Sequence, residues 1–438
     1  MRTAAATSAR PRTLLLVGPT IWDREELRVP SRAADVRTIE VDEPGYHVPE
    51  TAGIGMIFRR FDVLGHIERV VEVARRARVD GVLGTEEFLS CAVAAVVARR
   101  LGLPGPDPGA VLRCQHKYHS RLAQREAAPE CVPAFAPIDP RRPDAGRLRF
   151  PLYVKPVRGT TSVLTRRVQS PTELREFVAF NFLERAAARR VLRPFHDLLR
   201  AFTDLKPDAA CFLAEEELTG ALVTVEGYAF KGRVEMVGVT DSTMFPGTMS
   251  FMRFDYPSKL PREAQARMGE IAVRLVSRLG LDNTLFNVEM FYDARTGRIG
   301  VVEVNPRMSY QFADLYEKVD GFNSYDIATA LAFGEEPVVK RGAGPYRMAA
   351  SFVLRRFENS TIARMPSPAE IATLFAEFPD ARLRLYGRPG MKIRAPSRLS
   401  ESFRYGLIHL GGDSPADLER RFDRARAMLT FEFGGSDN

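Results

Sequence analysis

The sequence has few cysteines and no long apolar run. Its four cysteines (Cys91, Cys114, Cys131 and Cys211) lack the Cys-x-x-Cys spacing of zinc ribbons, and their scatter is not that of a small disulfide-rich fold. The first apolar run, Leu14–Val17, is far too short for a signal peptide or a membrane-spanning helix. We therefore expect a cytoplasmic protein with no membrane partner.

Lysine is scarce as well. Of the 63 basic residues, 55 are arginine and only 8 are lysine. The formal net charge is +8, but the arginines are dispersed along the chain instead of gathering with aromatic residues into a stripe. This dispersal argues against a nucleic-acid partner. Because lysine is not a common surface residue in this chain, a lysine inside a motif is informative.

The chain is long enough for several domains. Its 438 residues allow roughly two to four of them, and 45% hydrophobic and 27% charged residues are typical of a globular protein. The first ~110 residues alternate candidate strands (13–18, 36–41 and 80–84) with helical patterns, which predicts a parallel α/β unit. A linker rich in proline and glycine follows at 102–109.

Three Ser-Pro motifs predict helix starts further along the chain. In each motif the serine suits the N-cap, the proline suits the first helical position, and an acid follows at the third. The motifs begin at Ser170, Ser367 and Ser414. Two of these helices therefore belong to the last hundred residues.

The segment 285–307 has the pattern of a β-hairpin, since two alternating apolar stretches flank a polar turn at 293–297. The expected cross-strand pairs are Phe291–Val301, Glu289–Glu303 and Asn287–Asn305. All of them share one face of the sheet. Two facing carboxylates repel each other, and a Mg²⁺ ion held by Glu289, Glu303 and the Asn305 amide would remove that repulsion. A polar face turned to solvent and a register slipped by one residue are the alternatives.

Two motifs place positive charge beside polar segments. Arg307 follows the hairpin, where a guanidinium can hold phosphoryl or carboxylate oxygens in a two-pronged contact. One arginine among 55 is also commonly a surface residue. Lys155 ends an apolar strand before the loop 158–162, whose hydroxyl and backbone N–H groups can cover phosphates. An ordinary turn at Gly159 is the alternative for this loop.

In their order along the chain these motifs resemble those of the ATP-grasp superfamily, and the resemblance covers nearly the whole sequence. The most specific match is Val302-Glu-Val-Asn-Pro-Arg307. The site residues that the resemblance implies are Lys117, Lys155, Thr160, Thr161, Ser162, Glu215, Leu218 and Glu226 for ATP, Glu289, Glu303 and Asn305 for Mg²⁺ (or Mn²⁺), and Arg307 for catalysis.

The resemblance also implies a role for each ATP-binding residue. Lys117 and Lys155 would contact phosphates, with 158–162 as the covering loop. Glu215 would meet the adenine amino group, and Leu218 would offer backbone hydrogen bonds at the hinge between two lobes. Glu226 would lie on the ribose or phosphate side of the nucleotide.

The implied fold class is α/β and α+β. It begins with a Rossmann-like parallel α/β domain (1–110) and continues with the first ATP-grasp lobe, which carries the phosphate-covering loop (111–212). The second lobe carries the ATP and magnesium site (213–340), and a small C-terminal cap subdomain completes the chain (341–438).

The implied function is that of an ATP-dependent carbon–nitrogen ligase. Such an enzyme activates a small carboxylate, here expected to be that of an amino acid or similar acid, as an acyl phosphate, joins it to an amine and releases ADP and phosphate; a thiol acceptor is a variant. Its partners would be small molecules, and a homodimer is compatible with the family. The bulky Met308-Ser-Tyr-Gln311 follows the hairpin motif where many amino-acid ligases have glycines, so we expect a differently shaped acceptor pocket.

Two alternatives remain within this family. A carboxylase acting on bicarbonate is disfavoured because the longer glycine-rich run and a biotin-attachment motif are missing. A non-catalytic ATP-binding regulatory protein is disfavoured because the acids and both motif lysines are intact.

The magnesium assignment leads to a first prediction. Glu303→Gln replaces a charged ligand with a neutral amide of the same size, so we expect loss of ATP turnover with an unchanged fold. Steady-state ADP release measures the first effect and circular dichroism the second. Near-normal turnover in this variant would exclude Glu303 as a magnesium ligand.

Overall fold

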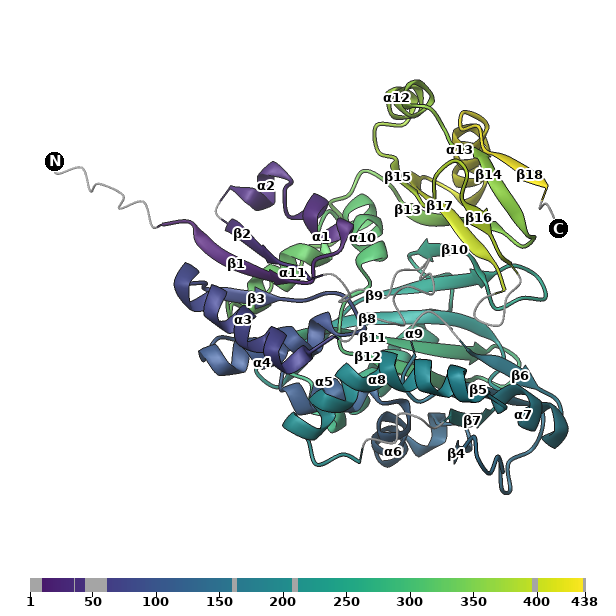
Figure 1. Cartoon of the computed structure of the whole chain (residues 1–438). Helices are drawn as coiled ribbons and strands as arrows, with labels where there is room; N and C mark the ends of the chain where they lie inside the picture. The colour runs from purple at the N-terminus through teal and green to yellow at the C-terminus, as the bar shows by residue number, and fades with distance from the viewer. Residues whose placement is uncertain are drawn as a thin grey trace.

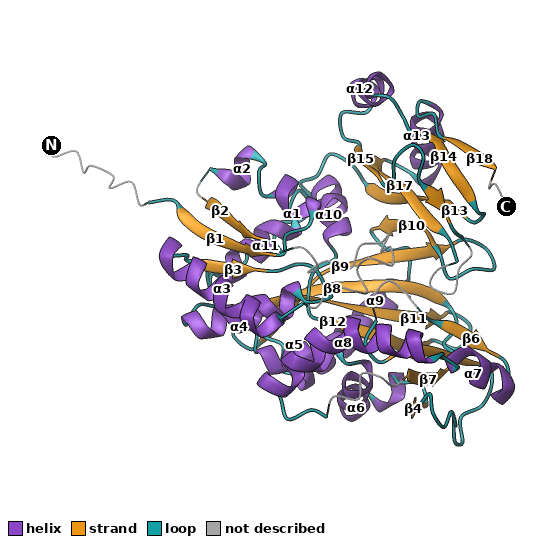
Figure 2. Ribbon diagram, in the orientation of Figure 1, coloured by secondary structure: helices purple, strands orange, loops and turns teal. Residues whose placement is uncertain are grey.

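The computed structural model describes residues 10–34, 36–43, 61–159, 164–206, 212–395 and 401–435. Within these ranges the strands form four sheets, with helices packed around them (Figures 1 and 2). None of the helices in the described ranges is both long and apolar enough to cross a bilayer.

The chain begins with a three-stranded parallel sheet, at the left of Figure 1. Its order is β2-β1-β3. The strands are β1 (Arg12–Val17), β2 (Val36–Val41) and β3 (Gly81–Leu83), and the helices of this unit are α1 (Ile21–Glu26), α2 (Pro30–Ala33), α3 (Val63–Ala77) and α4 (Ser90–Leu101). Helix α3 buries Val63, Ile67 and Val70, spaced three or four residues apart, as an amphipathic helix must. The expected parallel start of the chain is confirmed, whereas its identification as a Rossmann-like domain stays a prediction.

A four-stranded antiparallel sheet lies at the bottom of the molecule in Figure 1. Its strands, in the order β4-β7-β5-β6, are β4 (Phe135–Ile138), β7 (Phe212–Glu216), β5 (Leu152–Pro156) and β6 (Arg166–Val168). The accompanying helices are α5 (Pro108–Gln115), α6 (Lys117–Ala127), the 3₁₀ turn η2 (Pro129–Cys131), α7 (Pro171–Val178) and α8 (Phe182–Phe202). This sheet includes β7, so it extends beyond residue 212, the end expected for the first lobe.

An antiparallel sheet of eight strands crosses the middle of the molecule. In spatial order they are β12 (Arg298–Asn305), β11 (Thr284–Asp293), β8 (Ala221–Phe230), β9 (Arg233–Met244), β10 (Phe251–Tyr256), β13 (Met348–Arg356), β17 (Phe403–Gly412) and β15 (Arg382–Leu385). The helical segments that follow its strands in the chain are α9 (Arg262–Leu279), η3 (Tyr310–Phe312), α10 (Ala313–Asp320) and α11 (Ser324–Ala332). Three strands that follow residue 340 extend this sheet, so the C-terminal part shares it with the preceding part.

The rest of the C-terminal part is a small sheet with two helices, at the upper right of Figure 1. It consists of β16 (Lys392–Ile393), β14 (Ser360–Arg364), β18 (Glu432–Gly435), α12 (Pro368–Glu377) and α13 (Pro415–Ala427). The three predicted helix starts are confirmed, because Ser170, Ser367 and Ser414 each accept a hydrogen bond from the backbone N–H three residues on. At Ser367 the acid also returns the bond and completes a capping box.

The hairpin β11–β12 confirms two of the three predicted pairs. Glu289 faces Glu303, and Asn287 faces Asn305. The third prediction is wrong, because Phe291 faces Gly300. Near the turn, Asp293 pairs with Arg298, and the same register continues along the strands to Met290. A bulge between Met290 and Glu289 then shifts the pairing by one residue, so that the two acids face each other. The symmetric pairing assumed from the turn therefore holds only beyond the bulge.

The largest apolar core joins the N-terminal unit to both larger sheets. It includes Leu112 of α5, Phe195 of α8, Leu275 of α9 and Phe286 of β11, all fully buried. Phe286 lies opposite Gly227 of β8, where an added Cβ would come within 2.5 Å of its ring. The phenyl ring thus fills space that the glycine leaves open.

This packing predicts a large stability effect at Phe286. Truncation by Phe286→Ala leaves a cavity in this core beside β8, and we expect the free energy of unfolding to fall by about 3–5 kcal/mol. Phe182→Ala is the control, since that side chain is 74% exposed and its loss should change stability by no more than about 0.5 kcal/mol. Urea denaturation of both variants measures the difference, and equal losses would contradict the packing.

Candidate active site

The two hairpin acids lie together at the end of the eight-stranded sheet. Glu289 and Glu303 are cross-strand partners, and the Asn305 amide donates through Nδ2 to Asn287 Oδ1 at 2.9 Å and to Glu303 Oε1 at 3.4 Å. Burial, and then the charge of Glu303, raises the pKa of Glu289. Burial also acts to raise the pKa of Glu303, but Lys117 and Lys155 outweigh it and hold that pKa below its usual value. The pKa values of the two acids are therefore shifted in opposite directions.

Lys117 contacts the hairpin directly. It begins helix α6, and its backbone N–H donates to the Val157 carbonyl at 2.8 Å, which fixes the start of the helix beside β5. Its Nζ lies 2.5 Å from Glu303 Oε2. A lysine expected at the phosphates and an acid expected at the metal are thus brought together, although 186 residues separate them.

A buried ion-pair network lies behind this contact. Glu215 at the end of β7 accepts from Arg121 Nε at 2.5 Å and pairs with Lys155 Nζ at 2.8 Å. Burial would raise the pKa of Glu215, but the two cations outweigh burial and lower it to about 2. Burial lowers the pKa of Lys155, an effect that Glu215 opposes. The predicted contact of Glu215 with adenine stays a prediction, since in this structure both carboxylate oxygens face cations.

Arg121 is a site residue that the sequence analysis missed. Its side chain is 2% exposed, and Nη2 donates to the Val302 carbonyl at 2.8 Å. Val302 is the extra residue of the bulge and lies on the edge strand of the sheet, where a backbone carbonyl can accept from outside the ladder. The only signal in the sequence is that Arg121 follows Lys117 by four residues, one turn along the same helix face.

Glu226 lies on the neighbouring strand, opposite Asn287. It is fully buried, and its Oε1 accepts from the Ser309 backbone N–H, so it fixes the segment that follows Arg307. Burial raises the pKa of this carboxyl to about 7. Its predicted contact with the nucleotide stays a prediction.

Leu218, expected to contact ATP at the hinge, lies against the hairpin. The Leu218 side chain covers Gly300 of β12, because a Cβ on that glycine would lie 2.5 Å from Leu218 Cδ2. Thr160, Thr161 and Ser162 lie outside the described residues.

Arg307 leaves the sheet after β12 and points to the N-terminal unit. Its Nε donates to Glu87 Oε2 at 2.9 Å, and its Nη1 donates to the Met308 carbonyl at 3.1 Å. Burial would lower the pKa of the guanidinium, but the negative charge of Glu87 overrides this effect and raises the pKa, so Arg307 stays charged. Glu87 is a second residue that the sequence analysis missed.

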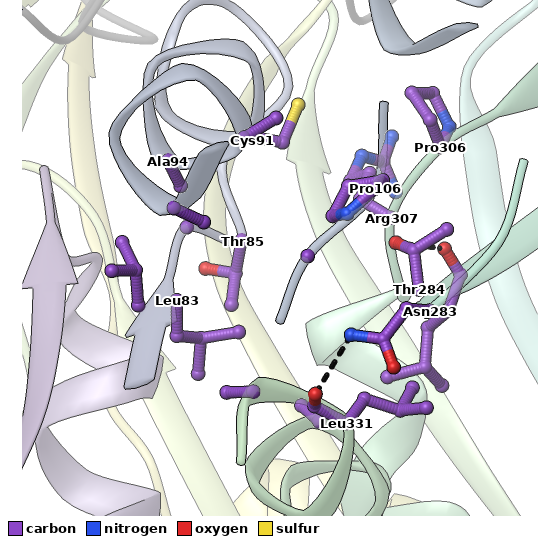
Figure 3. A pocket seen from close by; sticks show the side chains of 18 of the residues that line it. Leu83, Thr85, Cys91, Ala94, Pro106, Asn283, Thr284, Pro306, Arg307 and Leu331 are labelled. Atoms are coloured by element: carbon purple, nitrogen blue, oxygen red, sulfur yellow. Dashed lines mark hydrogen bonds between the residues drawn. The ribbon is translucent and has the colours of Figure 1, made fainter. Parts of the chain in front are cut away.

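A small cavity adjoins Arg307 (Figure 3). It lies between the end of β3, helix α4, the segment 104–106 and the start of β11, with α11 closing one side. Its walls are mostly apolar and include Leu83, Ala94 and Leu331. The hairpin acids do not line it. At about 60 Å³ it has room for about two water molecules, so it is not the place for a nucleotide.

A comparison with protein families identifies the central part of the chain. The model of the ATP-grasp domain family matches residues 148–315, which include Lys155, Glu215, Glu289, Glu303 and Arg307. This range holds the strands β5 to β8 and the hairpin β11–β12. The residues gathered in the site therefore lie largely within the matched domain.

This chain matches parts of longer curated proteins. Carnosine synthase 1 of Gallus gallus is 29% identical over 319 residues, which are 68% of this chain and 32% of that protein. The large chain of carbamoyl phosphate synthase from Kocuria rhizophila is 40% identical over 73 residues, or 17% of this chain and 6% of that one. The chain thus spans a third or less of the length of these two relatives.

Solved structures share the fold over nearly the whole chain. The L-amino acid ligase from Bacillus licheniformis superposes with a TM-score of 0.71 at 18% identity, covering 98% of this chain and 100% of that one. The biotin carboxylase domain of the 2-oxoglutarate carboxylase from Hydrogenobacter thermophilus, crystallised with MgADP, ADP and bicarbonate, gives a TM-score of 0.65 at 15% identity, covering 96% and 91%. The arrangement of strands and helices described above is therefore shared with these two proteins.

The buried network predicts the effect of removing one partner. Arg121→Met leaves Glu215 with a single cation and frees the Val302 carbonyl, so we expect the free energy of unfolding to fall by about 3–5 kcal/mol. Arg99→Met is the matched control, because the Arg99 side chain is 65% exposed and its ion pair with Asp107 is 3.4 Å long. Replacing Arg99 should lower the free energy of unfolding by no more than about 1 kcal/mol. Chemical denaturation measures both, and a small loss for Arg121→Met would contradict the network.

Proposed function

We propose that this chain is an ATP-dependent ligase that joins a carboxylate to an amine, since residues 148–315 match the model of the ATP-grasp domain family. One observation carries the proposal most strongly. The contact between Lys117 and Glu303, 2.5 Å long, joins a cation suited to phosphates with an acid suited to a metal ion. A nucleotide with its metal needs both groups at one place.

The donor set at the hairpin fits Mg²⁺, and Mn²⁺ could replace it. Glu289 and Glu303 supply carboxylate oxygens from adjacent strands. The Asn305 amide donates through Nδ2 to its neighbours, which leaves its carbonyl oxygen as an acceptor for a cation. Hard oxygen ligands of this kind suit Mg²⁺ together with phosphates. The ion would neutralise charge on the phosphates of ATP.

The reaction consists of two displacements. An oxygen of the carboxylate attacks the γ-phosphorus of ATP, the bond to the β–γ bridging oxygen breaks, and ADP leaves. The amine nitrogen then attacks the carbonyl carbon of the acyl phosphate, phosphate leaves, and the nitrogen loses a proton as the amide forms. The protein mainly positions the groups and neutralises charge. Lys117 and Lys155 serve the phosphates, and Arg307 serves the oxygens of the acyl phosphate.

The segment that follows Arg307 supports a substrate of limited size. Gln311 Nε2 donates to Ser351 Oγ at 2.7 Å, which ties the segment to β13. The centres of the Tyr310 ring and of the Trp22 ring, which belongs to the N-terminal unit, lie 5.8 Å apart. Three parts of the chain thus close around this side of the site. An amino acid or a similar small acid is the carboxylate that we propose, with small molecules and not nucleic acid as partners, in the cytoplasm.

A phosphate-release screen tests the proposed function. The purified chain is incubated with ATP, Mg²⁺ and a panel of amino acids and other small carboxylates crossed with amines. We expect ADP and phosphate in amounts that depend on both a carboxylate and an amine, with an amide product detected by mass spectrometry. Glu303→Gln serves as the inactive control. ADP release that depends on bicarbonate alone would replace the proposal with a carboxylase, and ATP binding without turnover would replace it with a regulatory protein.

A further inference from the structure

Glu87 joins three parts of the chain at the edge of the site. It lies between β3 and α4 in the N-terminal unit, and its side chain is only 11% exposed. One carboxylate oxygen accepts from Arg307, which follows β12, and the other lies 3.5 Å from Nη1 of Arg158, which follows β5. A single buried acid therefore contacts guanidinium groups from both larger sheets.

The contact with Arg307 fixes the orientation of its guanidinium. Glu87 holds Nε at 2.9 Å and the Met308 carbonyl holds Nη1 at 3.1 Å, so two edges of a planar group are bound. Among the described residues, Nη2 donates no hydrogen bond. Because the group is planar, fixing two nitrogens also fixes the direction of the third. The two N–H groups of Nη2, with the second N–H of Nη1 beside them, are thus the donors that remain for an anionic substrate oxygen.

The position of Arg158 depends less on the Glu87 carboxylate than the position of Arg307 does. Its Nη2 donates to the backbone carbonyls of Glu87 and Phe88, both at 2.7 Å. Its guanidinium carbon also lies 4.9 Å from the centre of the Phe195 ring. These contacts do not use the carboxylate, so Arg158 keeps its place when the charge of Glu87 is removed. Within the described part of the chain, Arg307 donates to the Met308 carbonyl as its one other hydrogen-bond acceptor besides Glu87.

We infer that Glu87 is a positioning residue for Arg307, holding its guanidinium so that Nη2 faces the acyl phosphate. The inference rests on the proposed ligase function. Glu87 acts through Arg307 and does not itself touch the substrate. A displacement of about 1 Å in a group that stabilises the transition state costs roughly 100-fold in rate. Loss of the Glu87 charge should therefore lower kcat while leaving ATP binding intact.

Two variants and a control test this role. Glu87→Gln keeps the size of the side chain and removes its charge, while Glu87→Asp keeps the charge and withdraws it by one methylene group. We expect both to lower kcat for phosphate release, Glu87→Gln by roughly 10- to 100-fold, with KM for ATP changed by less than about twofold since the lysines are untouched. Glu335→Gln is the matched control, because Glu335 also pairs with an arginine, Arg12, across the edge of the N-terminal unit, but at the surface.

A double-mutant cycle separates positioning from stability. Arg307→Met has no charged or hydrogen-bonding group at the end of its side chain, so Glu87 has nothing to orient in that background. We expect Glu87→Gln to lower kcat further by less than about twofold there, against its full effect in the unmodified chain. The melting temperature should fall more in Glu87→Gln than in Glu335→Gln, because two buried guanidinium groups lose their counter-charge, so kcat is compared at a temperature where both variants are folded. Unchanged kcat, additive losses in the cycle, or a fall in kcat matched by a rise in KM for ATP would each overturn the inference.

The same assay keeps this inference apart from the proposed function. If the unmodified chain releases no phosphate with any carboxylate and amine, the ligase proposal fails. If the unmodified chain turns over and the Glu87 variants match it, only the positioning role fails.

Discussion

Pairing of buried charges is the constraint on which the site depends. A charge taken out of water is stable only where an opposite charge and hydrogen bonds replace the solvent. Glu215 lies between Arg121 and Lys155, and Glu303 faces Lys117. Glu87 lies in turn between Arg158 and Arg307. Each acid has its cation on a different element, so the positions of strands and helices that are far apart in the sequence are fixed by the same contacts that assemble the site.

This arrangement explains how the sheets relate to the chemistry. The eight-stranded sheet supplies the hairpin acids, and the four-stranded sheet with its helices supplies the lysines. The N-terminal unit supplies an acid to a region otherwise built by later parts of the chain. The apolar core is shared between these parts as well, with members from α5, α8, α9 and β11. Packing and charge pairing therefore act across the same boundaries.

The sequence was a good guide where a local pattern was enough. Alternation along 285–307 predicted the facing acids Glu289 and Glu303, and serine before proline predicted the helix starts. The pair Phe291–Val301 could not be predicted, because a register shift of one residue depends on turn geometry that alternation does not report. Arg121 and Glu87 were missed for another reason. Their partners Glu215 and Arg307 lie 94 and 220 residues away, and among 55 arginines nothing local marks a buried one.

The bulge at Val302 has a consequence for how the two larger sheets hold together. This residue lies on β12, the edge strand of its sheet, where alternate backbone groups bond to β11 and the others face outward. Arg121 binds the carbonyl of Val302, the residue that the pairing with β11 skips. The same guanidinium holds Glu215 on the other sheet. The guanidinium thus ties the open edge of one sheet to a strand of the other, so that its loss would free a backbone carbonyl and a buried carboxylate at once.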